Sequence, residues 1–204
     1  MGTAERKERD KQEMRRLILE TAKRLFIEEG FEKVTLRRIA EAIEYSVGTL
    51  YLYFSDKDEM LYALHSEGFE ELYRRQQRVL ALADPLERLR QHVRIYLTFA
   101  LEQPETYDLM FIMRSPAKKI QQEQGWTVGV RSYQALEENV KECLEAGLLK
   151  HTTPQVAAFA LWSQVHGIAS LIIRGRCILV SQEDISALAN NAVDFVLAHL
   201  ETRT

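Results

Sequence analysis

The segment from Thr35 to Lys57 constrains this chain most, because its apolar residues fall into two short helical patterns separated by a few polar positions. The apolar positions are Leu36, Ile39, Ala40 and Ile43, followed by Val47, Leu50 and Phe54. Spacings of three and four residues predict helices with one buried face. Two short helices joined by a tight turn form a helix-turn-helix, which places its second helix in the major groove of DNA.

The outward positions of the second pattern carry no charge. They are small, hydroxylated or aromatic: Ser46, Gly48, Thr49, Tyr51 and Tyr53. Such a face can approach a phosphate backbone without steric or charge conflict. We therefore interpret this face as the candidate DNA-reading surface.

These residues resemble a known family. Gly48-Thr49-Leu50-Tyr51-Leu52-Tyr53-Phe54, followed by Lys57, is similar to the recognition segment of the TetR/AcrR transcriptional repressors. Upstream, residues 18–26 and Gly30-Phe31 resemble the first helix of that family and its glycine stop. Downstream, Ala160-Leu161-Trp162 with His166-Gly167 resembles a C-terminal subgroup marked by a Trp, His, Gly signature.

The resemblance implies a role for each matching residue. Thr35, with its backbone amide, is expected to hold a phosphate, and Gly48 and Thr49 are expected to approach base edges. The remaining expected contacts, mainly to phosphates, are Tyr51, Tyr53 and Lys57, with Ser46 and Arg37 as neighbours.

Two positions depart from the common family pattern. Val47 stands where a basic residue is frequent, and Leu52 stands where a polar or basic residue is frequent. Both changes remove charge from the interface. Shape and phosphate contacts are therefore expected to matter more, with the N-terminal arm compensating.

The composition predicts an all-α fold. The chain of 204 residues holds only four prolines and nine glycines, and no alternating pattern predicts a sheet. Periodicity and start signals predict about nine helices. We expect a helix-turn-helix DNA-binding domain over residues 1–60 and an effector-binding and dimerisation domain over residues 61–204.

Local signals predict several helix boundaries: Thr35 and Ser46 as N-caps, Asp84-Pro85 and Thr153-Pro154 as helix starts, and Gly147 as a helix stop. The first helix is expected from about Arg9 to Glu29, with Gly30 as the glycine cap that ends it. A capping box of Ser55 and Asp58 is expected to open a fourth helix that continues towards Leu82. Residues 118–125 are polar enough to form a loop or a mobile helix end.

The net charge of −3 is not that of an obvious nucleic-acid binder. The distribution of charged residues matters more than the net charge. Six basic residues lie close together in the N-terminal arm: Arg6, Lys7, Arg9, Lys11, Arg15 and Arg16. Arg37, Arg38 and Lys57 form a second cluster. The acidic residues nearby are then expected to face away from the DNA.

The two cysteines, Cys143 and Cys177, lie in apolar helical patterns of a chain without a secretory leader. Two buried thiols are therefore expected rather than a disulfide, although a redox pair would require only that they lie close together. The most apolar segment, from Val156 to Ile173, is interrupted by Gln164 and His166, so no membrane span is expected. The predicted location is the cytoplasm.

Helix-turn-helix modules usually bind DNA as symmetric pairs. We therefore expect a homodimer through the last two helices, with a monomer core as the competing interpretation. The aromatic and methionine residues between the two ends predict a pocket for an unknown small-molecule effector. Its candidate residues, each of which is also explained by ordinary core packing, are Phe99, Tyr107, Met110, Phe111, Trp126, Tyr133, Trp162 and His166.

An enzyme is not expected, because the five histidines are scattered singly, and no phosphate-binding glycine loop occurs. No metal or cofactor is predicted. The expected partners are double-stranded operator DNA, a second copy of the chain and the effector. The alternative function is a helical ligand-binding or protein-interaction module with a degenerate helix-turn-helix, which the uncharged Val47 and Leu52 favour.

Overall fold

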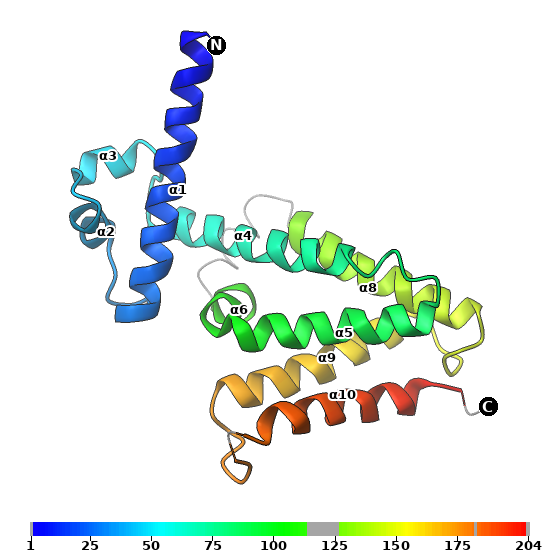
Figure 1. Ribbon diagram of the computed structural model, residues 1–204. Helices are drawn as coiled ribbons and strands as arrows, with labels where there is room; N and C mark the ends of the chain where they lie inside the picture. The colour runs from blue at the N-terminus through cyan, green and yellow to red at the C-terminus, as the bar shows by residue number, and fades with distance from the viewer. Residues whose placement is uncertain (1, 114–126, 182, 203–204) are drawn as a thin grey trace. The chain divides into compact units, whose positions relative to one another are not determined.

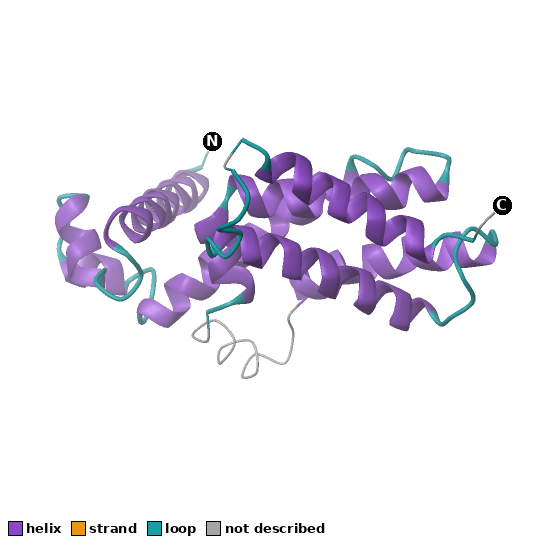
Figure 2. Ribbon diagram, turned by 90° about the horizontal axis from the view of Figure 1, so that it is seen from below, coloured by secondary structure: helices purple, strands orange, loops and turns teal. Residues whose placement is uncertain are grey.

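The computed structural model describes residues 2–113, 127–181 and 183–202, and its regular elements in these ranges are all helices (Figures 1 and 2). The same residues contain one isolated antiparallel bridge, between Leu149 and Glu201. The all-α prediction is therefore confirmed. The chain divides into two compact units, with the division falling inside the fourth helix after Glu67 and inside the sixth helix after Tyr107.

The first unit holds three helices and parts of two others. They are α1 (Thr3–Glu29), α2 (Leu36–Ala42), α3 (Val47–Tyr51), the start of α4 (Lys57–Gln77) and the end of α6 (Pro104–Phe111). Their apolar faces share one core, in which Ile18, Ile39, Leu50 and Phe54 are fully buried. The spacing that predicted the helix-turn-helix therefore also defines the buried face of each helix.

The second unit is built mainly from four further helices. They are α5 (Pro85–Glu102), α8 (Thr127–Glu145), α9 (Pro154–Ile173) and α10 (Ile185–Leu200). Helices α5, α8 and α9 pack against one another, and α10 packs on α5 and α9 (Figure 1). The predicted starts at Asp84-Pro85 and Thr153-Pro154 are confirmed, because the Asp84 carboxylate accepts from Leu86 N at 2.9 Å and Thr153 Oγ1 accepts from Val156 N at 3.3 Å.

Helix α1 begins at Thr3, six residues before the predicted start at Arg9. This arm has no apolar stripe, which is why periodicity missed it. It consists of good helix formers whose side chains pair one turn apart, as in Gln12 to Glu8 at 3.2 Å and Arg9 to Glu13 at 3.7 Å. Gly30 ends the helix with a φ of 87°, as the glycine signal predicted.

Helix α4 starts one residue later than the predicted capping box requires. Asp56 rather than Ser55 caps it, because Asp56 Oδ1 accepts from Glu59 N at 2.7 Å. Glu59 in turn accepts from Ser55 N at 2.6 Å. The helix ends at Gln77 and not near Leu82, because the following amides bond three residues back in tight turns, as Leu80 N does to Gln77 O at 3.3 Å.

Helix α9 (Pro154–Ile173) is long and apolar enough to cross a membrane by length and composition alone, with a mean hydropathy of 1.7, and 28% of the residues in that window are buried. The core helix of a soluble protein has the same length and composition, so the expectation of no membrane span stays a prediction. Gln164 and His166 do not remove the apolar character of this helix, because neither side chain carries a permanent charge. The other residues of this window are half-buried or exposed in the structure.

Candidate nucleic-acid interface

Thr35 stands at the start of α2, where the sequence placed it. Its backbone is extended and its Oγ1 accepts a hydrogen bond from Arg38 N at 3.2 Å. Arg37 is exposed on the first turn and pairs with Glu41 at 3.2 Å. A residue that caps a helix holds its own backbone amide at the surface, so Thr35 can offer both that amide and its hydroxyl to an anion.

The turn between α2 and α3 is a Schellman motif formed without glycine. Glu44 adopts a φ of 60°, and the amide of Tyr45 donates to Ala40 O at 3.0 Å. Sequence reasoning missed this turn, because a left-handed residue is usually marked by glycine or asparagine. The motif reverses the chain within four residues and fixes the angle at which α3 leaves α2.

Helix α3 has one buried side and one open side. Leu50 is fully buried, and Val47 and Tyr53 pack partly against the core of the first unit. On the open side, Tyr51 is 55% exposed and Leu52 is 78% exposed.

Gly48 also lies on the open side. A Cβ added to it would meet Ser46 Oγ at 3.6 Å, which is ordinary contact. Nothing in the free protein therefore requires glycine at this position, so its small size is available for the approach of another molecule.

Two hydroxyl groups lie side by side at the start of α3. Ser46 Oγ accepts from Thr49 N at 3.1 Å and lies 2.9 Å from Thr49 Oγ1. The pair holds two hydroxyl protons, and their mutual hydrogen bond uses one. The other proton remains to be donated outward, whichever residue carries it.

Lys57, at the start of α4, is already engaged within the first unit. Its Nζ donates to the carbonyl of Phe31 and lies 5.7 Å from the centre of the Phe26 ring. These contacts tie the start of α4 to the end of α1. An ammonium group has three donors, so Lys57 can hold this carbonyl and still offer protons to a phosphate.

The acidic residues near the helix-turn-helix are largely paired with arginines. Glu29 receives a forked bond from Arg38, with Nη2 to Oε1 at 2.6 Å, and Glu28 pairs with Arg24 at 3.0 Å. The hydrogen bond and the charge of Glu29 raise the pKa of Arg38. These pairs neutralise the carboxylates in place, so repulsion of a phosphate backbone is smaller than the number of acids suggests.

The candidate effector residues are only partly brought together. Phe99 and Tyr107 are fully buried in the second unit, whereas Met110 and Phe111 belong to the first unit, and Trp126 lies outside the described residues. Tyr133, Trp162 and His166 form one aromatic cluster, with ring centres 5.9 Å apart for the first pair and 5.8 Å for the second.

His166 is the hydrogen-bonded centre of this cluster. Tyr107 Oη lies 2.7 Å from its Nδ1, and Tyr96 Oη, which sequence reasoning did not single out, lies 3.0 Å from the same atom. Burial lowers the pKa of His166 and raises that of Tyr96. A neutral imidazole accepting at Nδ1 therefore fits the geometry, with its proton on Nε2.

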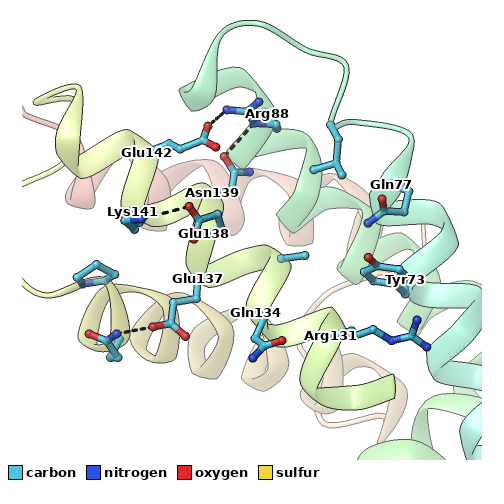
Figure 3. Close-up of a pocket in the computed structure, with 14 residues that line it drawn as sticks. Tyr73, Gln77, Arg88, Arg131, Gln134, Glu137, Glu138, Asn139, Lys141 and Glu142 are labelled. Carbon is cyan, nitrogen blue, oxygen red and sulfur yellow. Dashed lines mark hydrogen bonds and ion pairs between the residues drawn. The ribbon is translucent and has the colours of Figure 1, made fainter. Parts of the chain in front are cut away.

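A different part of the second unit carries an open cavity of about 640 Å³ (Figure 3). Its lining is polar and comes from α4, α5, α8 and the start of α9. Figure 3 shows Arg88 bonded to Glu142 and Asn139 on one side and Tyr73 with Arg131 on the other. None of the predicted effector residues that the structure describes lines this cavity.

The cysteines are free in the structure, with Cys143 buried and Cys177 half-buried. Burial raises the pKa of the Cys143 thiol to about 11, which keeps it protonated. Among the described residues, no group of three or more histidine, cysteine or acidic side chains could hold a metal ion.

Comparison with known proteins identifies two family domains. Residues 18–64 match the description "Bacterial regulatory proteins, tetR family", and residues 89–199, more than half of the chain, match "Tetracyclin repressor-like, C-terminal domain". The chain is 43% identical over 58 residues to the HTH-type transcriptional repressor Rv1474c of Mycobacterium tuberculosis, covering 28% of this chain and 31% of that repressor. The chain therefore matches about a third of the length of that relative.

Two further relatives match over a greater length. The HTH-type transcriptional regulator HbdR of Aromatoleum sp. is 24% identical over 163 residues, covering 78% of this chain and 69% of HbdR. A TetR/AcrR transcriptional regulator from Thermobifida fusca has a similar fold, with a TM-score of 0.70 at 20% identity over 91% of this chain and 97% of that one. The chain belongs to the TetR family of bacterial regulatory proteins, which are helix-turn-helix transcriptional regulators and not enzymes.

Proposed function

We propose that this protein is a transcriptional repressor that binds operator DNA as a homodimer through α3 and is released by a small apolar or amphipathic effector. The observation that carries the proposal is the open side of α3, where Gly48, Tyr51 and Leu52 are exposed while Leu50 anchors the helix from beneath. A helix held in this way can enter a major groove without unfolding any part of its own core.

The contacts divide into those that position the protein and those that read bases. Thr35, Arg37, Tyr51, Tyr53 and Lys57 bind phosphates in this proposal. Ser46, Gly48 and Thr49 lie at the base edges. Tyr53 is partly buried against the core, so it contributes its hydroxyl and not its ring face. Residues 1–60 act as the DNA-binding domain.

Basic residues on the N-terminal arm supply the charge that α3 lacks. The exposed arm is helical from Thr3, and its arginines alternate with the acids that pair with them. Phosphate is a stronger competitor for arginine than an exposed carboxylate one turn away, because exposed ion pairs contribute about 1 kcal/mol or less. The arm is therefore free to exchange these partners for DNA.

Dimerisation through α9 and α10 follows from their uncovered apolar residues. Phe159 is 58% exposed on α9 and Phe195 is 65% exposed on α10. No atom of the described residues lies within 4 Å of a Cβ added to Gly167, so a helix of a second copy can approach closely there. A second copy would bury this surface and place two recognition helices about 34 Å apart.

The aromatic cluster around His166 supports an apolar or amphipathic effector. Trp162 and Tyr133 provide ring faces beside the buried hydrogen-bonded group of His166, Tyr96 and Tyr107. Such a compound releases DNA if it binds more tightly to a conformation with mismatched recognition helices. Residues 61–204 form the effector-binding and dimerisation domain, and we place the protein in the cytoplasm with its operator.

Footprinting with the purified full chain tests this proposal. The protein is mixed with the DNA that flanks its own gene, with random DNA as competitor. We expect a protected segment with twofold symmetry, and weaker binding by Tyr51→Phe, which lacks only one hydroxyl. Equal affinity for flanking and random DNA would contradict the proposal.

The effector is tested separately. Acyl and aromatic compounds are titrated while the fluorescence of the two tryptophans is followed. Compounds that change it are then tested for release of the protected DNA. If every compound that binds leaves the operator affinity unchanged, effector release is contradicted while DNA binding stands.

A further inference from the structure

The open side of α3 contains none of the side chains that form bidentate pairs with guanine or adenine. From Val47 to Leu52 the sequence is Val-Gly-Thr-Leu-Tyr-Leu, without arginine, lysine, asparagine, glutamine or an acid. The bidentate pairs of arginine or lysine with guanine, and of asparagine or glutamine with adenine, are therefore unavailable to this helix. The base feature in the major groove that an apolar surface can recognise is the 5-methyl group of thymine.

Gly48 and Leu52 lie on the same side of α3. They are four positions apart, and Leu52 retains helical backbone angles (φ −73°, ψ −17°) although it ends the helix. Side chains on a helix lean towards its N-terminus, so the leucine side chain extends towards the position above Gly48. The glycine contributes no side chain to fill that position.

The space above Gly48 is open. Among the described residues, the one heavy atom that approaches an added Cβ within 4 Å is Ser46 Oγ at 3.6 Å, apart from atoms of the helix backbone and chain neighbours. Leu52 is 78% exposed, more than Tyr45 or Tyr51 beside it. The exposed surface around Gly48 therefore combines an apolar side chain at Leu52, bare backbone at Gly48 and hydroxyls at Ser46 and Thr49.

We propose that Gly48 and Leu52 together form a thymine-methyl slot, which makes Leu52 a specificity-determining residue for the operator. The methyl group contacts the leucine side chain and the glycine Cα. The free proton of the Ser46 and Thr49 pair faces the neighbouring O4 acceptor of the same base. This inference rests on the proposed DNA-binding function and adds to it the base that α3 selects.

Replacing thymine by deoxyuridine tests the slot, because it removes the methyl group alone. Duplexes are first selected from a randomised pool with the wild-type protein. Each thymine of the selected duplex is then replaced by deoxyuridine symmetrically in both half-sites, and Kd is measured by fluorescence anisotropy at fixed salt. At one thymine per half-site we expect Kd to rise about 10- to 25-fold, from a loss of about three- to fivefold in each half.

Leu52→Ala assigns that loss to the leucine. In this variant the same replacement should change Kd by less than about 1.5-fold, while Leu52→Met should retain the sensitivity, because methionine restores the apolar wall. Leu80→Ala truncates another exposed leucine, 44% exposed in the second unit, and should behave as wild type. Circular dichroism confirms that each variant is folded.

Two results would overturn the inference while leaving DNA binding intact. In one, the Leu52→Ala protein loses as much affinity as wild type when the methyl group is removed. In the other, no thymine replacement changes the wild-type Kd by more than about 1.5-fold. A wild-type protein that selects no duplex at all would instead overturn the proposed function and this inference with it.

Discussion

The two compact units expose apolar residues in different ways. In the first unit the exposed Tyr51 and Leu52 lie at the C-terminal end of the five-residue helix α3, near the hydroxyls of Ser46 and Thr49 and near Gly48. In the second unit the exposed apolar residues extend along α9 and α10. Only 28% of the residues in one 18-residue window of α9 are buried. A small mixed surface suits the edges of bases, whereas a long apolar one suits another helix of the same kind.

The units also differ in how their sites are specified. Around α3 the decisive contacts are local, as in the Ser46 and Thr49 pair, which lie three residues apart. Around His166 they join distant segments, since Tyr107 lies 59 positions away in the chain. A site built from local contacts can be altered by one substitution without disturbing the fold. The predictions below test this difference between the two units.

The largest effect is expected at the apolar surface of the second unit. Phe195→Glu places a charge where a second copy should cover the ring, so the dimer should dissociate and the operator affinity should fall about 100- to 1,000-fold. Sedimentation velocity and anisotropy measure the two changes. Leu80→Glu is the matched control, and a Phe195→Glu protein that stays dimeric would place the interface elsewhere.

Each unit holds a buried histidine whose pKa burial lowers to about 4, His65 in the first and His92 in the second. The unfolded chain binds these protons near pH 6.5, so acid favours unfolding, and stability should fall as the pH drops from 6.5 towards 4. His92 lacks a hydrogen-bond partner among the described residues.

His92→Leu therefore removes the titration without breaking a bond. We expect it to recover up to about 3 kcal/mol of the acid loss while leaving the stability at pH 7.5 equal or higher. Urea unfolding at several pH values measures this. An unchanged slope between pH 6.5 and 4 would show that His92 is not protonated on unfolding.

A smaller effect on operator affinity distinguishes the charged contact of Lys57 from the hydroxyl contact of Tyr51. Lys57→Ala should weaken binding at least about tenfold and flatten the slope of log K against log salt by about 1.8, because one phosphate contact is lost in each half-site. Tyr51→Phe should weaken binding with the slope unchanged, because a hydroxyl displaces no counterion. Salt titrations of both variants decide this, and equal slopes for Lys57→Ala and wild type would remove the lysine from the interface.

The smallest effect is expected in the turn of the helix-turn-helix. Glu44→Gly should raise stability by about 0.5 to 1 kcal/mol, since glycine adopts a positive φ at little cost and glutamate does not. Thermal unfolding measures it, and operator affinity should stay within about twofold. A lower melting temperature would mean that the Glu44 side chain contributes more than its backbone strain costs.

The fold of the first unit could be predicted because its cues act over three or four residues. Thr35, Ser46 and Gly30 each mark a helix end by a mechanism that requires no distant partner. The missed features follow from the same limit. The N-terminal extension of α1 is stabilised by side-chain pairs and has no apolar periodicity. The turn at Glu44 places a glutamate at a positive φ, where glycine or asparagine is usual, so the sequence does not indicate it.

The second unit could be predicted only as helices. Their boundaries followed from Asp84, Thr153 and Gly147, but no pattern in the sequence indicates that Tyr96 meets His166. The open cavity near Arg88 was not predicted either, because most of its lining residues carry charged or amide side chains, which in a sequence are typical of an ordinary solvated surface. Packing between distant segments decides which of these residues come into contact, and such packing produces no periodic pattern in the sequence.

The central claim is that α3 enters a DNA groove with its glycine side foremost, and Gly48→Ala tests it most directly. Alanine fits the free protein, since its Cβ would lie 3.6 Å from Ser46 Oγ, and it favours the helix by up to about 1 kcal/mol. Anisotropy titration of the selected duplex, with thermal unfolding alongside, should give an equal or higher melting temperature and a Kd at least about tenfold higher. A folded Gly48→Ala protein that binds the duplex as tightly as wild type would contradict the account.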